Sequence, residues 1–236
     1  MKKNLLILVS FALTMSAFSQ NLQLHFDGRK SLHNAESPFT RNYPTATFEM
    51  FKPDKWGSTF MFVDLDFNMS RGNIGLAYME IARDQNLGNL PIKAHIEFNG
   101  GLVSWGNIHN AYLLGASYGT VVDGWILGTY LAYKYNAFER ISNDVQWTAT
   151  WSKNFFNDKF TVNGFIDIWS ENKIQEYYDT DGNKANNDKK LRLITEPQFW
   201  YNVDKHLSFG SEIEITNNFY STKTYVNPTI AAKWIF

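Results

Sequence analysis

The 236-residue chain contains no cysteine and only 6 prolines, and its 22 basic and 23 acidic residues almost cancel. The lack of cysteine excludes a disulfide framework, a thiolate metal site, a cysteine nucleophile and a lipid-bearing N-terminal cysteine. The lack of a basic excess argues against binding to nucleic acid. Beyond the first twenty residues, no apolar run approaches the ~18 residues of a membrane-spanning helix. Aromatic residues, by contrast, make up 17% of the chain, which argues against disorder.

The start of the chain has the pattern of a secretory signal peptide. Two lysines follow the first Met, an apolar run spans residues 5–15, and Ala17 and Ser19 supply small residues where a signal peptidase reads. We therefore expect residues 1–19 to be removed on export. Residues 20–236 are then expected to form a single domain.

Apolar and polar residues alternate throughout the rest of the chain, in about twelve segments of roughly ten residues separated by turn-forming residues. A period of two is typical of strands with one apolar and one polar face. Tilted strands of this length cross the hydrocarbon layer in a closed barrel. We predict a transmembrane antiparallel up-and-down β-barrel of about twelve strands. The clearest outward sets are Met61, Val63 and Leu65; Ile92, Ala94, Ile96 and Phe98; Trp125, Leu127, Thr129, Leu131 and Tyr133; Val145, Trp147, Ala149 and Trp151; and Leu207, Phe209, Ser211, Ile213 and Ile215.

The connections between these segments alternate in length. Tight turns such as 122–124 and 157–159 follow even-numbered strands, whereas the two longest connections, 28–42 and 171–189, follow odd-numbered ones. Outer-membrane barrels show this asymmetry, with the short turns and both termini on the periplasmic side. We therefore expect a location in the outer membrane of a Gram-negative bacterium, in contact with lipid and lipopolysaccharide. The terminal Phe236 resembles the signal that the barrel-assembly machinery recognises.

A secreted soluble β-sandwich would also alternate, and the aromatic residues distinguish the two architectures. In a membrane barrel the apolar face is flanked by belts of Trp and Tyr at the lipid headgroups. Such rings lie on the outward phase, mostly near segment ends, at Trp125, Tyr133, Tyr135, Trp147, Trp151 and Trp234. This distribution favours the membrane barrel over a soluble periplasmic β-protein.

The inward phase combines aromatic rings with carboxylates, which suits a flat heterocycle that carries hydroxyls, such as a nucleoside. The predicted lumenal residues are Phe60, Phe62, Asp64, Asp66, Tyr78, Glu80, His95, Glu97, Asp167, Arg192 and Glu196, with Lys93, Asn99, Asn163, Phe165, Trp169, Gln198, Trp200, Glu212 and Glu214 on the same faces. Eight acids of this phase outnumber four bases, Lys93, Lys134, Arg192 and Lys233. The acidic excess disfavours anionic solutes.

Three stretches resemble the Tsx-like nucleoside-specific channel-forming family of outer-membrane proteins, through a Tsx-related family of unassigned function. They are 51–67 (F-K-P-D-K-W-G-S-T-F-M-F-V-D-L-D-F), 77–83 (A-Y-M-E-I-A-R) and 110–118 (N-A-Y-L-L-G-A-S-Y). The resemblance implies a nucleoside channel with binding roles for Glu80, Arg83 and the run 60–64. This chain is shorter than typical members, and no further binding residue of the family matches.

The resulting hypothesis is a monomeric channel for facilitated diffusion, not an enzyme, with no cofactor and no metal. Twelve strands lie between the eight that side chains can fill and the sixteen of open pores, so a narrow passage is expected. One alternative is a structural or adhesive barrel whose lumen is blocked by ion-paired side chains or by the connection 28–42. Another is an outer-membrane hydrolase that uses His109 or His95, with Ser117. The stretch 179–183 resembles a calcium loop, but its glycine falls two positions too early, so we expect a solvated loop there.

Overall fold

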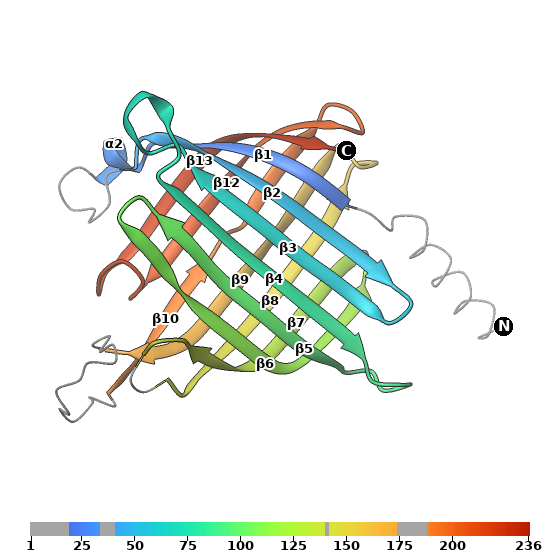
Figure 1. Cartoon of the computed structure of the whole chain (residues 1–236). Helices are drawn as coiled ribbons and strands as arrows, with labels where there is room; N and C mark the ends of the chain where they lie inside the picture. The colour runs from blue at the N-terminus through green and yellow to red at the C-terminus, as the bar shows by residue number, and fades with distance from the viewer. Residues whose placement is uncertain (1–18, 34–40, 140–141, 174–187) are drawn as a thin grey trace.

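The computed structural model describes residues 19–33, 41–139, 142–173 and 188–236 (Figure 1). The expected signal peptide, up to residue 18, and the calcium-like stretch 179–183 lie outside the described residues. Within these ranges, no helix is long and apolar enough to cross a membrane.

Strands make up most of the described chain and form one antiparallel sheet. In chain order they are β1 (Ser19–Asp27), β2 (Tyr43–Asp54), β3 (Gly57–Asp66), β4 (Leu76–Asn86), β5 (Lys93–Val103), β6 (Gly106–Val122), β7 (Trp125–Asn136), β8 (Asp144–Phe155), β9 (Phe160–Asn172), β10 (Lys189–Thr195), β11 (Gln198–Asn202), β12 (Leu207–Asn217) and β13 (Thr224–Ile235). Two short helical segments, α2 (Arg29–His33) and η2 (Ser70–Gly72), lie in the connections after β1 and β3.

The sheet closes on itself, because β1 pairs with both β2 and β13 (Figure 1). β10 and β11 each pair with both β9 and β12, so they are two halves of one strand. The predicted twelve-stranded antiparallel barrel is therefore confirmed. The interruption between β10 and β11 falls at Glu196 and Pro197. The sequence pattern predicts one continuous strand there. Proline has no N–H to donate to the ladder, and this accounts for the break.

Side chains alternate between the outside and the inside of the barrel as the sequence pattern predicts. On β1, Leu22, Leu24 and Phe26 are exposed, whereas Gln23 and His25 between them are buried. The antiparallel registers carry this phase around the whole barrel, and they place the predicted outward sets on the outer face. The registers also define the inner faces of β4 and β6: Tyr78 and Glu80 point inward on β4, as do Ala111, Leu113 and Ser117 on β6.

The tight turns after β2, β4, β6, β8 and β11 lie at the end of the barrel where β1 begins and β13 ends (Figure 1). β1 and β9, the strands before the two longest connections, end at the opposite end of the barrel, as predicted (Figure 1). One connection at that opposite end is short: Ser104 and Trp105 alone separate β5 from β6.

Candidate functional site

Part of the inner face borders a space inside the barrel. Several inward side chains keep accessible surface although they point away from the outer face, so that surface belongs to the lumen. Eight of the twelve predicted site residues are of this kind: Phe60, Phe62 and Asp64 on β3, Tyr78 and Glu80 on β4, Asp167 on β9, Arg192 on β10, and Glu196 at the break between β10 and β11.

Three aromatic rings form a continuous run on the inner face of β3 and β4. The ring centroids of Phe60 and Phe62 are 6.2 Å apart, and those of Phe62 and Tyr78 are 6.0 Å apart. The hydroxyl of Tyr78 donates a hydrogen bond to Glu80 Oε1 at 2.6 Å. Aromatic faces and a carboxylate therefore lie side by side, as the sequence predicted.

The inward carboxylates form two groups, and each group draws its members from strands on different sides of the barrel. In one group, the charge of Asp64 on β3 acts on Glu196 and on Glu212 of β12. Glu212 also accepts a hydrogen bond from Gln198 Nε2 at 2.7 Å. Residues far apart in the sequence thus face the same part of the lumen.

The second group of carboxylates contains Glu80, Glu97 and Asp167, with the ammonium of Lys134. Lys134 Nζ donates to Gln146 Oε1 at 2.9 Å and lies 4.8 Å from the centre of the Trp169 ring. Three carboxylates and one ammonium leave an excess of acceptors for a donor-rich solute.

Three predicted site residues, Asp66, His95 and Glu97, point inward but are buried in the wall of the barrel. Asp66 accepts hydrogen bonds from the hydroxyls of Tyr43 and Thr45. His95 lies between Asp84 Oδ1 at 2.8 Å and Glu97 Oε2 at 3.2 Å. These contacts make Asp66 and His95 structural, whereas Glu97 Oε1 has no hydrogen-bond partner.

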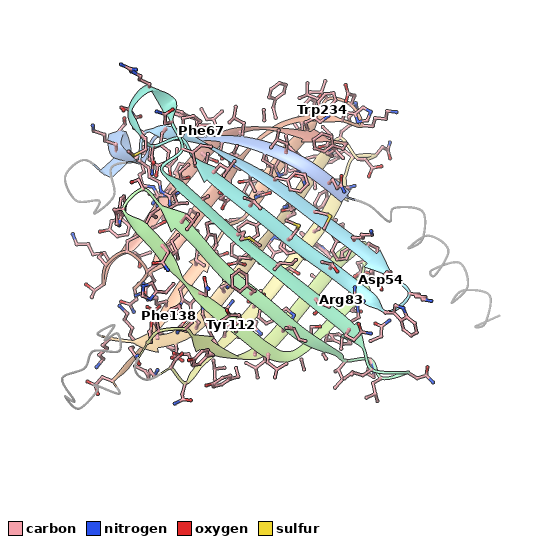
Figure 2. All side chains as sticks on the ribbon, viewed as in Figure 1. Asp54, Phe67, Arg83, Tyr112, Phe138 and Trp234 are labelled. Carbon is pink, nitrogen blue, oxygen red and sulfur yellow. The ribbon has the colours of Figure 1, made fainter. Side chains whose placement is uncertain are left out.

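The placement of Arg83 in the lumen is wrong. Arg83 pairs with Thr59 in the register between β3 and β4, on the face opposite Glu80. Its guanidinium binds both carboxylate oxygens of Asp54, at 2.6 and 2.9 Å, beside the tight turn that follows β2 (Figure 2). Residues three apart in a strand lie on opposite faces, so Glu80 and Arg83 cannot share a lumenal site.

In the part of the chain that the structure describes, Ser117, His95 and His109 do not form the catalytic group that the hydrolase alternative requires. The hydroxyl of Ser117 donates to Asp84 Oδ1 at 2.7 Å, the same oxygen that His95 contacts. His109 lies near Phe138, with ring centroids 5.9 Å apart. Among the residues that the structure describes, no group of three acidic or histidine side chains is arranged to hold a metal ion.

The end of the barrel opposite the termini is lined by an ionic network. Arg29, at the start of α2, is 2% exposed and contacts Asp27 Oδ2 at 2.8 Å and Glu214 Oε1 at 3.0 Å. Its guanidinium lies over the ring of Tyr220, whose hydroxyl donates to Glu214 Oε2. Burial raises the pKa of the Tyr220 phenol. The first turn of the connection after β1 is thereby fixed to the wall.

The sequence interpretation missed several inward residues. Glu49, Asp84, Asp144 and Glu171 also follow the inward phase, and so does Tyr130 on β7. Extending the period of two along β2, β4, β7, β8 and β9 would have found them.

Comparison with known proteins assigns the chain to a family. The family described as "Domain of unknown function (DUF5020)" matches residues 19–236, the whole of the barrel. The chain belongs to the DUF5020 family. No curated protein matches this DUF5020 barrel in sequence.

Solved structures similar to the DUF5020 barrel include two porins. A NanC porin, 10% identical, covers 92% of this chain and 99% of its own, with a TM-score of 0.56. A KdgM porin, 9% identical, gives the same coverages and a TM-score of 0.51, and a KdgM porin in complex with disordered oligogalacturonate is equally similar. At these identities, the likeness establishes the barrel fold.

Proposed function

We propose that this DUF5020 barrel resides in the outer membrane of a Gram-negative bacterium and passes small polar solutes by facilitated diffusion, as a monomer. The outer face supports the membrane location. Contiguous exposed apolar patches on soluble monomers rarely exceed a few hundred Å². Here apolar side chains are exposed on strands all around the barrel, among them Leu22, Leu24, Ile96, Leu114, Leu131, Val145, Phe209 and Ile230.

The observation that carries the channel proposal is the accessible inner face. Rings of Phe60, Phe62 and Tyr78 lie beside the carboxylates of Asp64 and Glu80, and all five keep accessible surface inside a closed barrel. Weak binding at several separate points along the lumen lets a solute enter and leave without an energy source. The similarity in fold to porins is consistent with this function.

The charge of the interior favours neutral or cationic solutes. One of the KdgM structures is named for its complex with oligogalacturonate, a polyanion. The acidic excess in the present lumen opposes such a ligand, because like charges repel most strongly where water is scarce.

Nucleosides are the solute class that we propose. A base can stack on Phe62 and Tyr78, while Glu80 and Asp64 accept hydrogen bonds from amino groups and ribose hydroxyls. The resemblance of 51–67 and 77–83 to the Tsx-like family supports the same class.

The test is a planar-bilayer recording of the refolded barrel with and without adenosine or uridine. We expect ion conductance that the nucleosides reduce. Since stacking of a base on an aromatic ring is worth about 1–3 kcal/mol, Phe62→Ala should raise the half-blocking concentration about tenfold. Glu80→Ala should act in the same direction. The outward Phe209→Ala is the matched control and should behave like the parent.

A barrel with a blocked lumen is the second candidate, favoured by the buried contacts of Arg29 with Asp27 and Glu214. It predicts no conductance at all from a correctly folded barrel. Conductance that nucleosides do not change would leave a general pore, and the proposed solute class would be wrong.

A further inference from the structure

Three hydrogen-bond acceptors lie together on the inner face of β4 and β5. Glu80 is directly opposite Asn99 in the register of the two strands, and Glu97 is two residues before Asn99, on the same face. Side chains opposite each other in an antiparallel pair have Cβ atoms about 4.5–5.5 Å apart. The carboxylate of Glu80 is therefore flanked by the side chains of Glu97 and Asn99.

Two of these acceptors have no donor. Glu97 Oε1 and Asn99 Oδ1 are buried atoms without a hydrogen-bond partner, and the residues are only 5% and 6% exposed. The other carboxylate oxygen of Glu97 contacts His95 Nε2 at 3.2 Å. Buried polar atoms in proteins are nearly always satisfied, so two neighbouring exceptions indicate donors that arrive with a ligand.

The charges around the three acceptors favour a cation. The carboxyl groups of Glu97 and Asp167 and the amino group of Lys134 lie close enough to interact electrostatically with Glu80. Lys134 Nζ already donates to Gln146, and Tyr78 supplies one hydrogen bond to Glu80. Three acids thus share one basic group, and a further cation beside them favours their ionised forms.

We infer that Glu80, Glu97 and Asn99 form a subsite for the ammonium group of a primary amine, which makes the channel selective for amine-bearing cations. An ammonium group carries three N–H donors, and the subsite offers three acceptors from two adjacent strands. This inference rests on the proposed channel function and adds solutes with a protonated amine to the nucleosides proposed above.

The experiment uses the refolded barrel in planar bilayers, with methylammonium chloride and tetramethylammonium chloride on opposite sides. Tetramethylammonium has the same charge but no N–H donor. We expect a reversal potential that shows a preference for cations over chloride and for methylammonium over tetramethylammonium. Glu80→Gln should lower the permeability ratio of methylammonium to tetramethylammonium about tenfold, the effect of losing a charged hydrogen bond.

Asn99→Leu tests the subsite independently of the overall negative charge of the lumen. It removes one acceptor, keeps the size of the side chain and changes no charge, so it should lower the same ratio several-fold without altering the preference for cations over chloride. Asp123→Asn, in the turn between β6 and β7, removes one negative charge outside the lumen and should leave the ratio unchanged.

The outcomes distinguish this inference from the channel proposal. A folded barrel without conductance overturns both. Conductance with equal permeability to the two ammonium ions, or a ratio that Asn99→Leu does not change, overturns the amine subsite and leaves the channel standing. A shift in electrophoretic mobility on boiling shows, for each variant, that the barrel has folded.

Discussion

The phenol ring of Tyr130 stacks on the imidazole of His95, with ring centroids 3.9 Å apart and planes inclined by 17°. The two residues lie on β7 and β5, and β6 between them presents Gly115 at the level of His95. Because His95 also contacts Asp84 and Glu97, the ring covers an ionic group inside the barrel wall.

Replacing Tyr130 should destabilise the barrel through loss of this stacking. Tyr130→Ala is expected to lower the free energy of unfolding by about 3–5 kcal/mol, the range for removing a large aromatic side chain. Tyr130→Phe keeps the stacking and loses only the hydrogen bond that Gln146 Nε2 donates to the hydroxyl at 2.8 Å, worth about 0.5–1.5 kcal/mol. Urea unfolding in lipid vesicles, followed by tryptophan fluorescence, measures both. Equal losses for the two variants would contradict the stacking role.

Gly115 is expected to be intolerant of any side chain. A Cβ atom there would lie 2.1 Å from Leu131 O and 2.5 Å from Ala132 Cα, both of them backbone atoms of the neighbouring strand. Gly115→Ala should therefore destabilise the barrel by about 1–3 kcal/mol, as overpacking does. Gly119→Ala is the matched control on the same face of β6, where the nearest atom is Leu127 O at 3.5 Å. If both variants unfold at the same urea concentration, the close approach at Gly115 is unimportant.

The sequence alone was sufficient for the barrel and for the inward or outward direction of most residues. The reason is physical: a strand in contact with lipid on one side must alternate, and each outward set of Leu, Ile, Trp and Tyr fixes the phase of its strand. The same rule would have placed Arg83 outside, three positions from Glu80. The error came from carrying over a short motif as a unit.

The distinction between lumen and wall could not be predicted from the pattern. Phe62, Asp66 and Glu97 share the inward phase, yet Phe62 is accessible, Asp66 is bound by Tyr43 and Thr45, and Glu97 is buried. Which inward side chain is covered depends on its partners on other strands, such as Tyr43 and Thr45 on β2 beside Asp66. The registers that bring such partners together come from the closed sheet.

Arg29 should be essential to the stability of the end of the barrel opposite the termini. Arg29→Ala leaves the carboxylates of Asp27 and Glu214 buried without their partner, which typically costs about 3–5 kcal/mol. Lys30→Ala, at the next position of α2 and exposed, should change the stability little. Thermal unfolding of the refolded variants measures the difference. A small effect of Arg29→Ala would show that water reaches these carboxylates.

Asp204 should make the stability of the turn between β11 and β12 dependent on pH. Its Oδ1 accepts hydrogen bonds from the backbone N–H groups of His206 at 2.7 Å and Leu207 at 2.9 Å, and these bonds lower its pKa below the usual 3.8. A carboxyl whose pKa is lower in the folded state stabilises that state above its unfolded pKa, and the contribution is lost as the pH falls through the folded value. Asp204→Ala should therefore unfold at lower urea than the parent at about pH 7, and the gap should close as the pH falls through the lowered pKa of Asp204. A gap that stays constant with pH would contradict this role.

Arg83 provides the sharpest test of the boundary between the lumen and the outer face. Its side chain is 28% exposed and paired with Asp54 on the outer face, so Arg83→Gln should leave nucleoside block unchanged in the recordings where Phe62→Ala weakens it. The stability should fall by only about 0.2–1 kcal/mol, as for ion pairs near a surface. Asp54→Asn should have the same small effect, and the double variant should lose no more than either single one, because both changes remove the same pair. A change in nucleoside block on replacing Arg83 would mean that the guanidinium influences the lumen from outside the wall, which the alternation of β4 does not allow.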